Sequence, residues 1–134
     1  MYHVDITNAG GYSFNIKSKD YEFIVDAKGK GIMPPEVFLA SLGSYMGVYL
    51  RKYAEGTKFE LPEFSLSVDA QLSNEAPVCF REIEFKIDLK GAKIDERRIK
   101  AISEFIKNCP LHATIKNNPE IRVEIKQYNK GYSA

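Results

Sequence analysis

The stretch VFLASLGSYMGVYL, Val37 to Leu50, decides the fold. It holds fourteen consecutive uncharged residues in a chain in which 28% of the residues are charged. A membrane-spanning helix needs about 20 apolar residues, so this run is too short to cross a bilayer. It is also longer than an ordinary strand. We therefore expect a helix with almost no side that faces water, which must be buried all round.

Composition indicates one domain, residues 1–134, in a reducing and cytoplasmic compartment. Nineteen basic and eighteen acidic side chains leave a net charge of +1, which favours neither a nucleic-acid nor a membrane partner. Two cysteines are too few for a disulfide scaffold. A basic segment followed by an apolar core is absent from the amino terminus, so we expect no signal peptide.

Strand and helix patterns surround the apolar run. Alternation predicts three antiparallel strands before it, a hairpin of two strands after it, a helix opened by Asp95, a short helical turn opened by Pro110 and a closing strand. The predicted strands are 2–7, 12–16, 21–26, 64–72, 80–89 and 121–125, and residues 128–134 are expected to form a frayed tail. Gly56 is the expected residue at which the central helix stops.

The resulting order, β-β-β-α-β-β-α-β, predicts an α+β fold. A domain of 134 residues has little interior in which to surround a helix on every side. Small residues recur along the apolar run at Ala40, Gly43 and Gly47, where another backbone can come close. We therefore predict a homodimer in which two copies share their central helices.

Cys109 is the residue with the best local case for chemistry. Proline favours the first position of a helix, so Cys109 before Pro110 is the expected N-cap, where a thiolate gains from the helix dipole. His112 can add a positive charge when protonated. The competing interpretation is a buried, unreactive cysteine. Cys79 is interpreted as a small apolar filler, and His3 as a surface residue. No spacing of ligands predicts a metal site, and no motif predicts a cofactor.

Two motifs resemble those of one family. The segment PPEVFLASLGSY, residues 34–45, resembles the central-helix motif of the OsmC/Ohr family, whose usual form is Pro-x-Glu-Leu-Leu-x-x-(Ala/Gly)-Leu-Gly-x-Cys. The segment NCPL, residues 108–111, resembles the family's Cys-Pro pair, which opens a late helix. FREI, residues 80–83, is similar to the intervening strand, and the element order extends the resemblance over nearly the whole chain.

The resemblance implies an OsmC-like fold, with antiparallel sheets wrapped around a buried central helix in an intertwined homodimer. Paired pockets then lie at the subunit interface, and the candidate pocket residues are Ser41, Tyr45, Tyr49 and His112. Active members of the family reduce hydroperoxides. Their central-helix cysteine attacks the peroxide, and the Cys-Pro cysteine resolves the sulfenic acid as a disulfide. Glu36 and Cys109 are the candidate catalytic residues carried over.

The chain departs from the family at the attacking cysteine, because Tyr45 stands in its place. A phenol cannot form a sulfenic acid. Tyr12, after Gly10 and Gly11, stands where the Ohr branch has an activating arginine. We therefore expect a relative of the peroxide-stress enzymes that lacks the two-cysteine activity and keeps an interface pocket for a small apolar or oxidised ligand. Tyr45 either hydrogen-bonds in that pocket or fills it.

Two alternatives stay open. The first is a thiol-dependent hydroperoxide reductase that uses Cys109 alone or together with Cys79. The second is a non-catalytic structural or interaction module. Glu36 and Tyr45 are nine residues apart, which on an ideal helix points them in opposite directions. Either the helix begins after Glu36 or Glu36 serves the other subunit's pocket; its plainer role is to stabilise the helix N-terminus.

Overall fold

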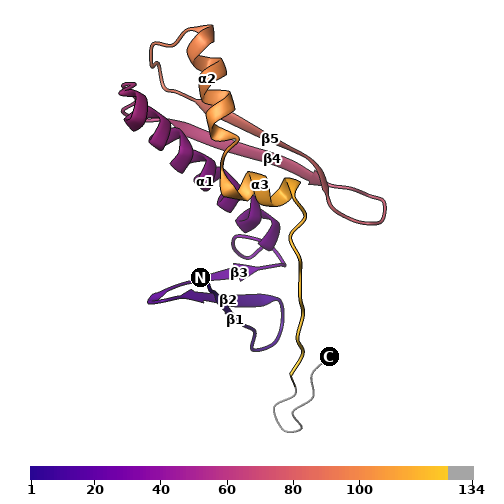
Figure 1. Ribbon diagram of the computed structural model, residues 1–134. Helices are drawn as coiled ribbons and strands as arrows, with labels where there is room; N and C mark the ends of the chain where they lie inside the picture. Colours follow the sequence, from indigo (N-terminus) through magenta and orange to yellow (C-terminus); the bar gives the residue numbers. More distant parts are fainter. Residues whose placement is uncertain (127–134) are drawn as a thin grey trace.

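The computed structural model describes residues 1–126, in the order β-β-β-α-β-β-α-α (Figure 1). The predicted tail, residues 128–134, lies outside the described residues. The strands are β1 (Asp5–Thr7), β2 (Ser13–Ser18), β3 (Tyr21–Asp26), β4 (Ser65–Leu72) and β5 (Phe80–Asp88). The helices are α1 (Pro34–Thr57), α2 (Glu96–Ile106) and α3 (Pro110–Lys116).

The central helix α1 begins with the two prolines that precede the apolar run. Met33 is its N-cap, and the Oε1 atom of Glu36 accepts a hydrogen bond from the Met33 N–H at 2.8 Å. Proline suits the first helical positions because its missing N–H would have no partner there. The helix therefore includes Glu36 in its first turn.

The predicted stop at Gly56 is wrong by two residues. Lys58 takes the left-handed conformation that usually favours glycine, with φ of 55°. The Phe59 N–H donates to the Ala54 carbonyl at 2.9 Å, and the Lys58 N–H also donates to carbonyls of the last helical turn. These bonds satisfy carbonyls of the last helical turn, so the helix ends two residues beyond Gly56.

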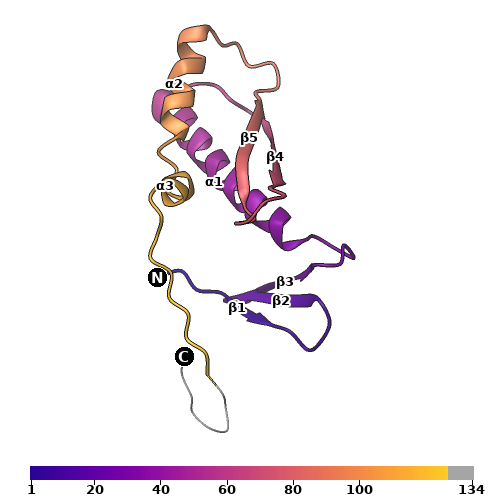
Figure 2. The same ribbon diagram turned by 90° about the vertical axis from the view of Figure 1, so that its right-hand side faces the viewer.

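The main core lies where α1 is covered by the β4–β5 hairpin and by α2. Figure 2 shows α1 between the hairpin and the pair α2 and α3. Leu50 is completely buried at the centre of this core. The buried members of the cluster are Met46, Leu50, Tyr53, Ala54, Leu61, Ile102 and Ile106. Asp95 holds the start of α2, as predicted, because its side chain accepts a hydrogen bond from the Arg98 N–H at 2.9 Å.

The three-stranded sheet lies at the amino-terminal end of α1, away from the hairpin (Figure 1). Its strands pair in the order β1-β2-β3, all antiparallel, which confirms the predicted meander. Val25 of β3 is buried, and together with Phe14 and Ile16 of β2 it lines an apolar hollow against Val37 of α1. This contact anchors the small sheet to the helix start.

One face of α1 stays open in the single chain. The buried positions of α1 lie on the sides that face the hairpin and α2, whereas Ala40, Ser44 and Val48, which follow one another at four-residue spacing along one side, are exposed. The side chain of Val48 keeps 46% of its surface exposed. The expectation that the helix is buried all round is therefore not met within one protomer, because two layers cover only two sides of a cylinder.

The predicted closing strand, Ile121 to Ile125, is wrong for the single chain. These residues form no strand, and Ile121 and Val123 are 81% and 73% exposed. Figure 1 shows this segment running away from the helices. Alternating apolar and polar residues form a strand only where the edge of another strand is free to pair with them. Within residues 1–126, no strand pairs with the segment 121–125.

Gly43 marks the closest approach of α1 to β4. A Cβ atom added there would lie 2.8 Å from Cγ2 of Val68 and 3.3 Å from Cδ2 of Leu66. We expect Gly43→Ala to lower the free energy of unfolding by about 1 to 2 kcal/mol, because overpacking outweighs the better helix propensity of alanine. Urea denaturation measures this change.

Gly56→Ala is the matched control for this substitution. Gly56 lies in the same helix with nothing within 4 Å of an added Cβ atom. This change is expected to raise the free energy of unfolding by about 0.5 to 1 kcal/mol. Stabilisation by both substitutions would contradict the close packing at Gly43.

Candidate active-site pocket and its relation to the helix groove

Two of the hollows beside α1 bear on the candidate site, and the smaller of these two contains Cys109. This Cys109 pocket has a volume of about 230 Å³ and lies between α1, β5 and α3. Its lining is mostly apolar, with three nitrogen-bearing side chains. The lining residues are Leu42, Met46, Phe80, Arg81, Ile83, Phe85, Cys109, His112, Ile115 and Lys116.

Cys109 lies at the N-cap of α3, where the sequence places it. Its side chain is 1% exposed, and its carbonyl accepts the Ala113 N–H at 3.0 Å to begin the helix. The thiol itself makes no capping hydrogen bond. Cys109 thus combines deep burial with a place in the pocket wall, whereas Cys79 is exposed, and both are free thiols.

His112 contributes a polar atom that is buried without a partner. Its Nε2 atom is inaccessible to water and forms no hydrogen bond with any described residue. The imidazole is half-buried in the pocket wall one turn after Cys109. A buried polar atom of this kind costs stability unless something else satisfies it.

Tyr45 lies on α1 close to Cys109 but outside the lining of the pocket. Its half-buried ring is 6.0 Å from that of Tyr49. Partial burial raises the pKa of the Tyr45 phenol above its usual 10.0, and the neighbouring Tyr2, Tyr49 and Cys109 add to this rise. The phenol is therefore protonated at neutral pH and can donate a hydrogen bond.

The other two predicted pocket residues, Ser41 and Tyr49, also lie outside the Cys109 pocket. Ser41 is exposed, and its carbonyl accepts a hydrogen bond from the Ser44 hydroxyl at 3.2 Å. Tyr49 packs beside Phe105 of α2, with ring centroids 6.0 Å apart. Of the four predicted pocket residues, His112 alone lines this pocket.

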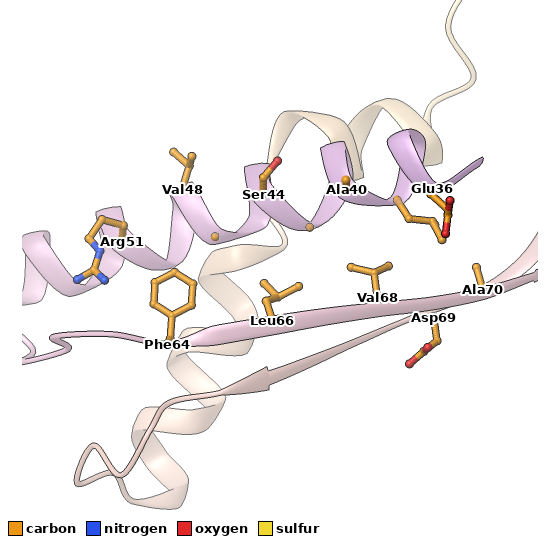
Figure 3. A pocket seen from close by; sticks show the side chains of 13 residues that line it. Glu36, Ala40, Ser44, Val48, Arg51, Phe64, Leu66, Val68, Asp69 and Ala70 are labelled. Carbon is orange, nitrogen blue, oxygen red and sulfur yellow. The ribbon is translucent and has the colours of Figure 1, made fainter. Parts of the chain in front are cut away.

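Glu36 faces the second hollow, which we call the α1–β4 groove. The groove has a volume of about 900 Å³ and opens along the exposed face of α1. Figure 3 shows Phe64, just before β4, and Leu66, Val68 and Ala70 of β4 pointing toward α1, while Asp69 of β4 points away. Because α1 begins at Pro34, the idea that the helix starts after Glu36 is wrong. Within this chain, Glu36 stabilises the helix N-terminus.

Several pocket residues were not predicted from the sequence. Phe80 forms one wall and is held by Phe38, whose ring stacks on it at 6.0 Å and 7°. Arg81 and Lys116 bring positive charge from β5 and α3. The period-two alternation of β5 does mark Ile83 and Phe85 as one face, but no sequence signal joins that face to α3.

A family model described as OsmC-like protein matches residues 27–124. The chain belongs to the OsmC-like protein family. A search of curated proteins found no match.

The OsmC-like fold is also found in solved structures at low sequence identity. An OsmC-like protein from Mycoplasma pneumoniae is 19% identical, with a TM-score of 0.77 and coverage of 88% of this chain and 89% of that one. An organic hydroperoxide resistance protein from Legionella pneumophila is 16% identical, with a TM-score of 0.65 and coverage of 88% and 92%. The organic hydroperoxide resistance protein OhrB of Bacillus subtilis is 18% identical, with a TM-score of 0.61 and coverage of 87% and 93%.

This OsmC-like chain has no arginine at the position after Gly10 and Gly11. Tyr12 is exposed there, and the ammonium of Lys28 lies 4.5 Å from the centre of its ring. Within residues 1–126, no three His, Cys, Asp or Glu side chains are grouped so as to hold a metal ion. No helix in the same range is long and apolar enough to cross a bilayer.

Proposed function

We propose that this OsmC-like protein binds a small apolar molecule in the Cys109 pocket and does not reduce hydroperoxides by the two-cysteine cycle. The observation that carries the proposal is that Tyr45, a protonated phenol, lies close to a pocket lined by Cys109. The pocket supplies a binding site, whereas the phenol removes the nucleophile.

The chemistry of Tyr45 supports the proposal that the two-cysteine cycle does not operate. A peroxidase cycle begins when a thiolate attacks the peroxide oxygen and becomes a sulfenic acid. A protonated phenol offers neither the negative charge nor the sulfur. The Cys109 thiol, 1% exposed, would have to act without the partner that the family's cycle requires.

The size and lining of the Cys109 pocket support the proposal that it binds a small apolar molecule. An engineered cavity of about 150 Å³ lined by apolar side chains binds benzene. The Cys109 pocket is larger, at about 230 Å³, and has apolar walls. It therefore accepts a substituted aromatic ring or a short aliphatic chain.

We further propose a homodimer in which a second copy covers the α1–β4 groove. The exposed side chain of Val48 on α1, and the small residues Ala40 and Ser44 on the same side of the helix, favour close contact with another helix. The unpaired segment from Ile121 to Ile125 has the alternation of a strand that lacks its partner edge. A second copy supplies both missing partners.

Thermal unfolding with 2-phenyl-2-propanol tests ligand binding in the Cys109 pocket. This alcohol is an unreactive analogue of an aromatic hydroperoxide, and we expect it to raise the melting temperature with increasing concentration. A ligand at one hundred times its dissociation constant stabilises by about 2.7 kcal/mol.

Ile115→Trp, which fills part of the pocket from α3, is expected to reduce this stabilisation. Ile99→Trp is the matched control, since Ile99 is also exposed on a helix but lies outside the pocket lining. The binding proposal would be rejected if the alcohol failed to stabilise the protein, or if it stabilised Ile115→Trp as much as the parent.

A further inference from the structure

We propose that the second copy in the α1–β4 groove lays its α1 antiparallel to the first, with Glu36 of each copy paired to the partner's Arg51. This inference rests on the proposed homodimer and adds the direction and the register of the two helices. The symmetry axis then passes beside α1 between Gly43 and Ser44, midway between the two charged residues.

The charges of the groove give the first argument. Glu36 and Arg51 lie at opposite ends of the groove, 15 residues apart on α1 (Figure 3). This spacing corresponds to about 22 Å along a helix. Asp69, the remaining charged residue of the lining, points away from α1, and its carboxylate lies 3.9 Å from the Lys86 ammonium. The open face of α1 therefore carries one acid near its start and one base four turns later.

This pattern of charge complements itself only when the two helices run in opposite directions. In a symmetric dimer, residue i of one copy meets residue j of the other, and j meets i. Reversing one helix places Glu36 opposite the partner's Arg51 at both ends of the contact. A parallel pair would place acid against acid and base against base, which is unfavourable across an interface.

Glu36 and Arg51 both keep hydrogen-bonding atoms for a partner. Oε1 of Glu36 accepts the Met33 N–H at 2.8 Å, and among residues 1–126 its Oε2 atom makes no hydrogen bond. Arg51 donates to the Leu61 carbonyl through one terminal nitrogen, which leaves other N–H groups of its guanidinium available. Within the described part of the chain, neither residue forms an ion pair. A carboxylate and a guanidinium form strong, charge-assisted hydrogen bonds.

The same register also places small residues where the two helices meet. It sets Ala40 beside the partner's Gly47, and Val48 beside the partner's Ala40. All three residues line the groove, and Ala40 and Val48 are exposed in the single chain. Small side chains at the contact allow the helix axes to approach to the lower end of the usual 8 to 10 Å.

Reversing each charge tests the pairs. Glu36→Arg and Arg51→Glu are each expected to weaken dimerisation of the full chain about a hundredfold in sedimentation equilibrium, because each variant homodimer then has two like-charge contacts. An equimolar mixture of the two variants is expected to regain the dissociation constant of the parent, since every pair across the interface again joins an acid to a base. Because the two substitutions are on separate chains, a repaired fold cannot explain this recovery.

Glu104→Arg and Arg97→Glu are the matched controls for charge reversal. Both residues are exposed on α2 and lie outside the lining of the groove. These variants are expected to dimerise as the parent does, whether alone or mixed.

Disulfide crosslinking tests the register without changing a charge. In a Cys79→Ser background, Ser44→Cys is expected to form a disulfide between copies under mild oxidation, because the two copies of residue 44 lie next to the symmetry axis. Val48→Cys is the control. Its two copies lie about 13 Å apart along the helices, whereas a disulfide spans at most about 7 Å between Cα atoms.

Each outcome supports or overturns a separate statement. A monomeric parent would overturn the proposed dimer together with this inference. A dimeric parent whose charge variants dimerise equally well, or whose mixed variants recover nothing, would overturn the pairing of Glu36 with Arg51 and leave the dimer standing. Equal crosslinking through residues 44 and 48 would overturn the antiparallel register.

Discussion

Val48→Glu is expected to convert the protein from a dimer into a monomer. Val48 is 46% exposed in the single chain and lines the α1–β4 groove that we propose a second copy covers. A carboxylate placed in a covered apolar contact loses its water, and Arg51, the cation of the same groove, already donates to the Leu61 carbonyl; such a change costs about 3 to 5 kcal/mol. Each copy of a symmetric dimer would carry this penalty. Sedimentation equilibrium of both proteins at the same concentration measures the change.

Ser103→Glu is the control for the added charge. Ser103 is exposed on α2 and lies outside the groove, so this variant is expected to keep the oligomeric state of the parent. A parent protein that is monomeric at micromolar concentration would contradict the proposed dimer. A dimer that survives Val48→Glu unchanged would contradict the proposed interface.

Leu50→Ala is expected to lower the free energy of unfolding by about 2 to 5 kcal/mol. Leu50 is fully buried at the centre of the cluster that joins α1 to α2, so truncation removes apolar burial and leaves a cavity. Guanidinium denaturation followed by circular dichroism measures this loss. Both proteins must be compared at one concentration, because a dimer's stability depends on it.

Leu72→Ala provides the matched leucine control. Leu72 lies at the end of β4 and is exposed, so its truncation is expected to cost about 1 kcal/mol or less. Similar losses for the two leucines would show that the core is not centred on Leu50.

The long helix and the two groups of strands could be predicted because each depends on local pattern. The uncharged run from Val37 to Leu50 requires burial, and the alternation in β2 and β5 requires a sheet. The end of α1 at Lys58 could not be predicted, because a lysine took the left-handed conformation expected of Gly56. The segment from Ile121 to Ile125 has a strand's pattern but finds no partner within the described chain.

The candidate site was only partly predictable from the sequence. Cys109 and His112 were found because the Cys-Pro pair sets the start of α3, and three residues later His112 faces the same hollow. Arg81 and Lys116 were missed because only the packing of β5 against α3 brings them to one pocket. Glu36 and Tyr45 were joined by the family motif, whereas the structure places Glu36 in the α1–β4 groove.

We propose that Tyr45, at the position of the attacking cysteine, leaves this OsmC-like protein without the first step of the peroxidase cycle. Consumption of cumene hydroperoxide in the presence of a dithiol reductant tests it most directly, with the Cys79→Ser, Cys109→Ser double variant as the background. We predict that the parent protein consumes the hydroperoxide no faster than this double variant. A rate well above that background, lost in the single variant Cys109→Ser, would contradict the claim and assign the chemistry to Cys109.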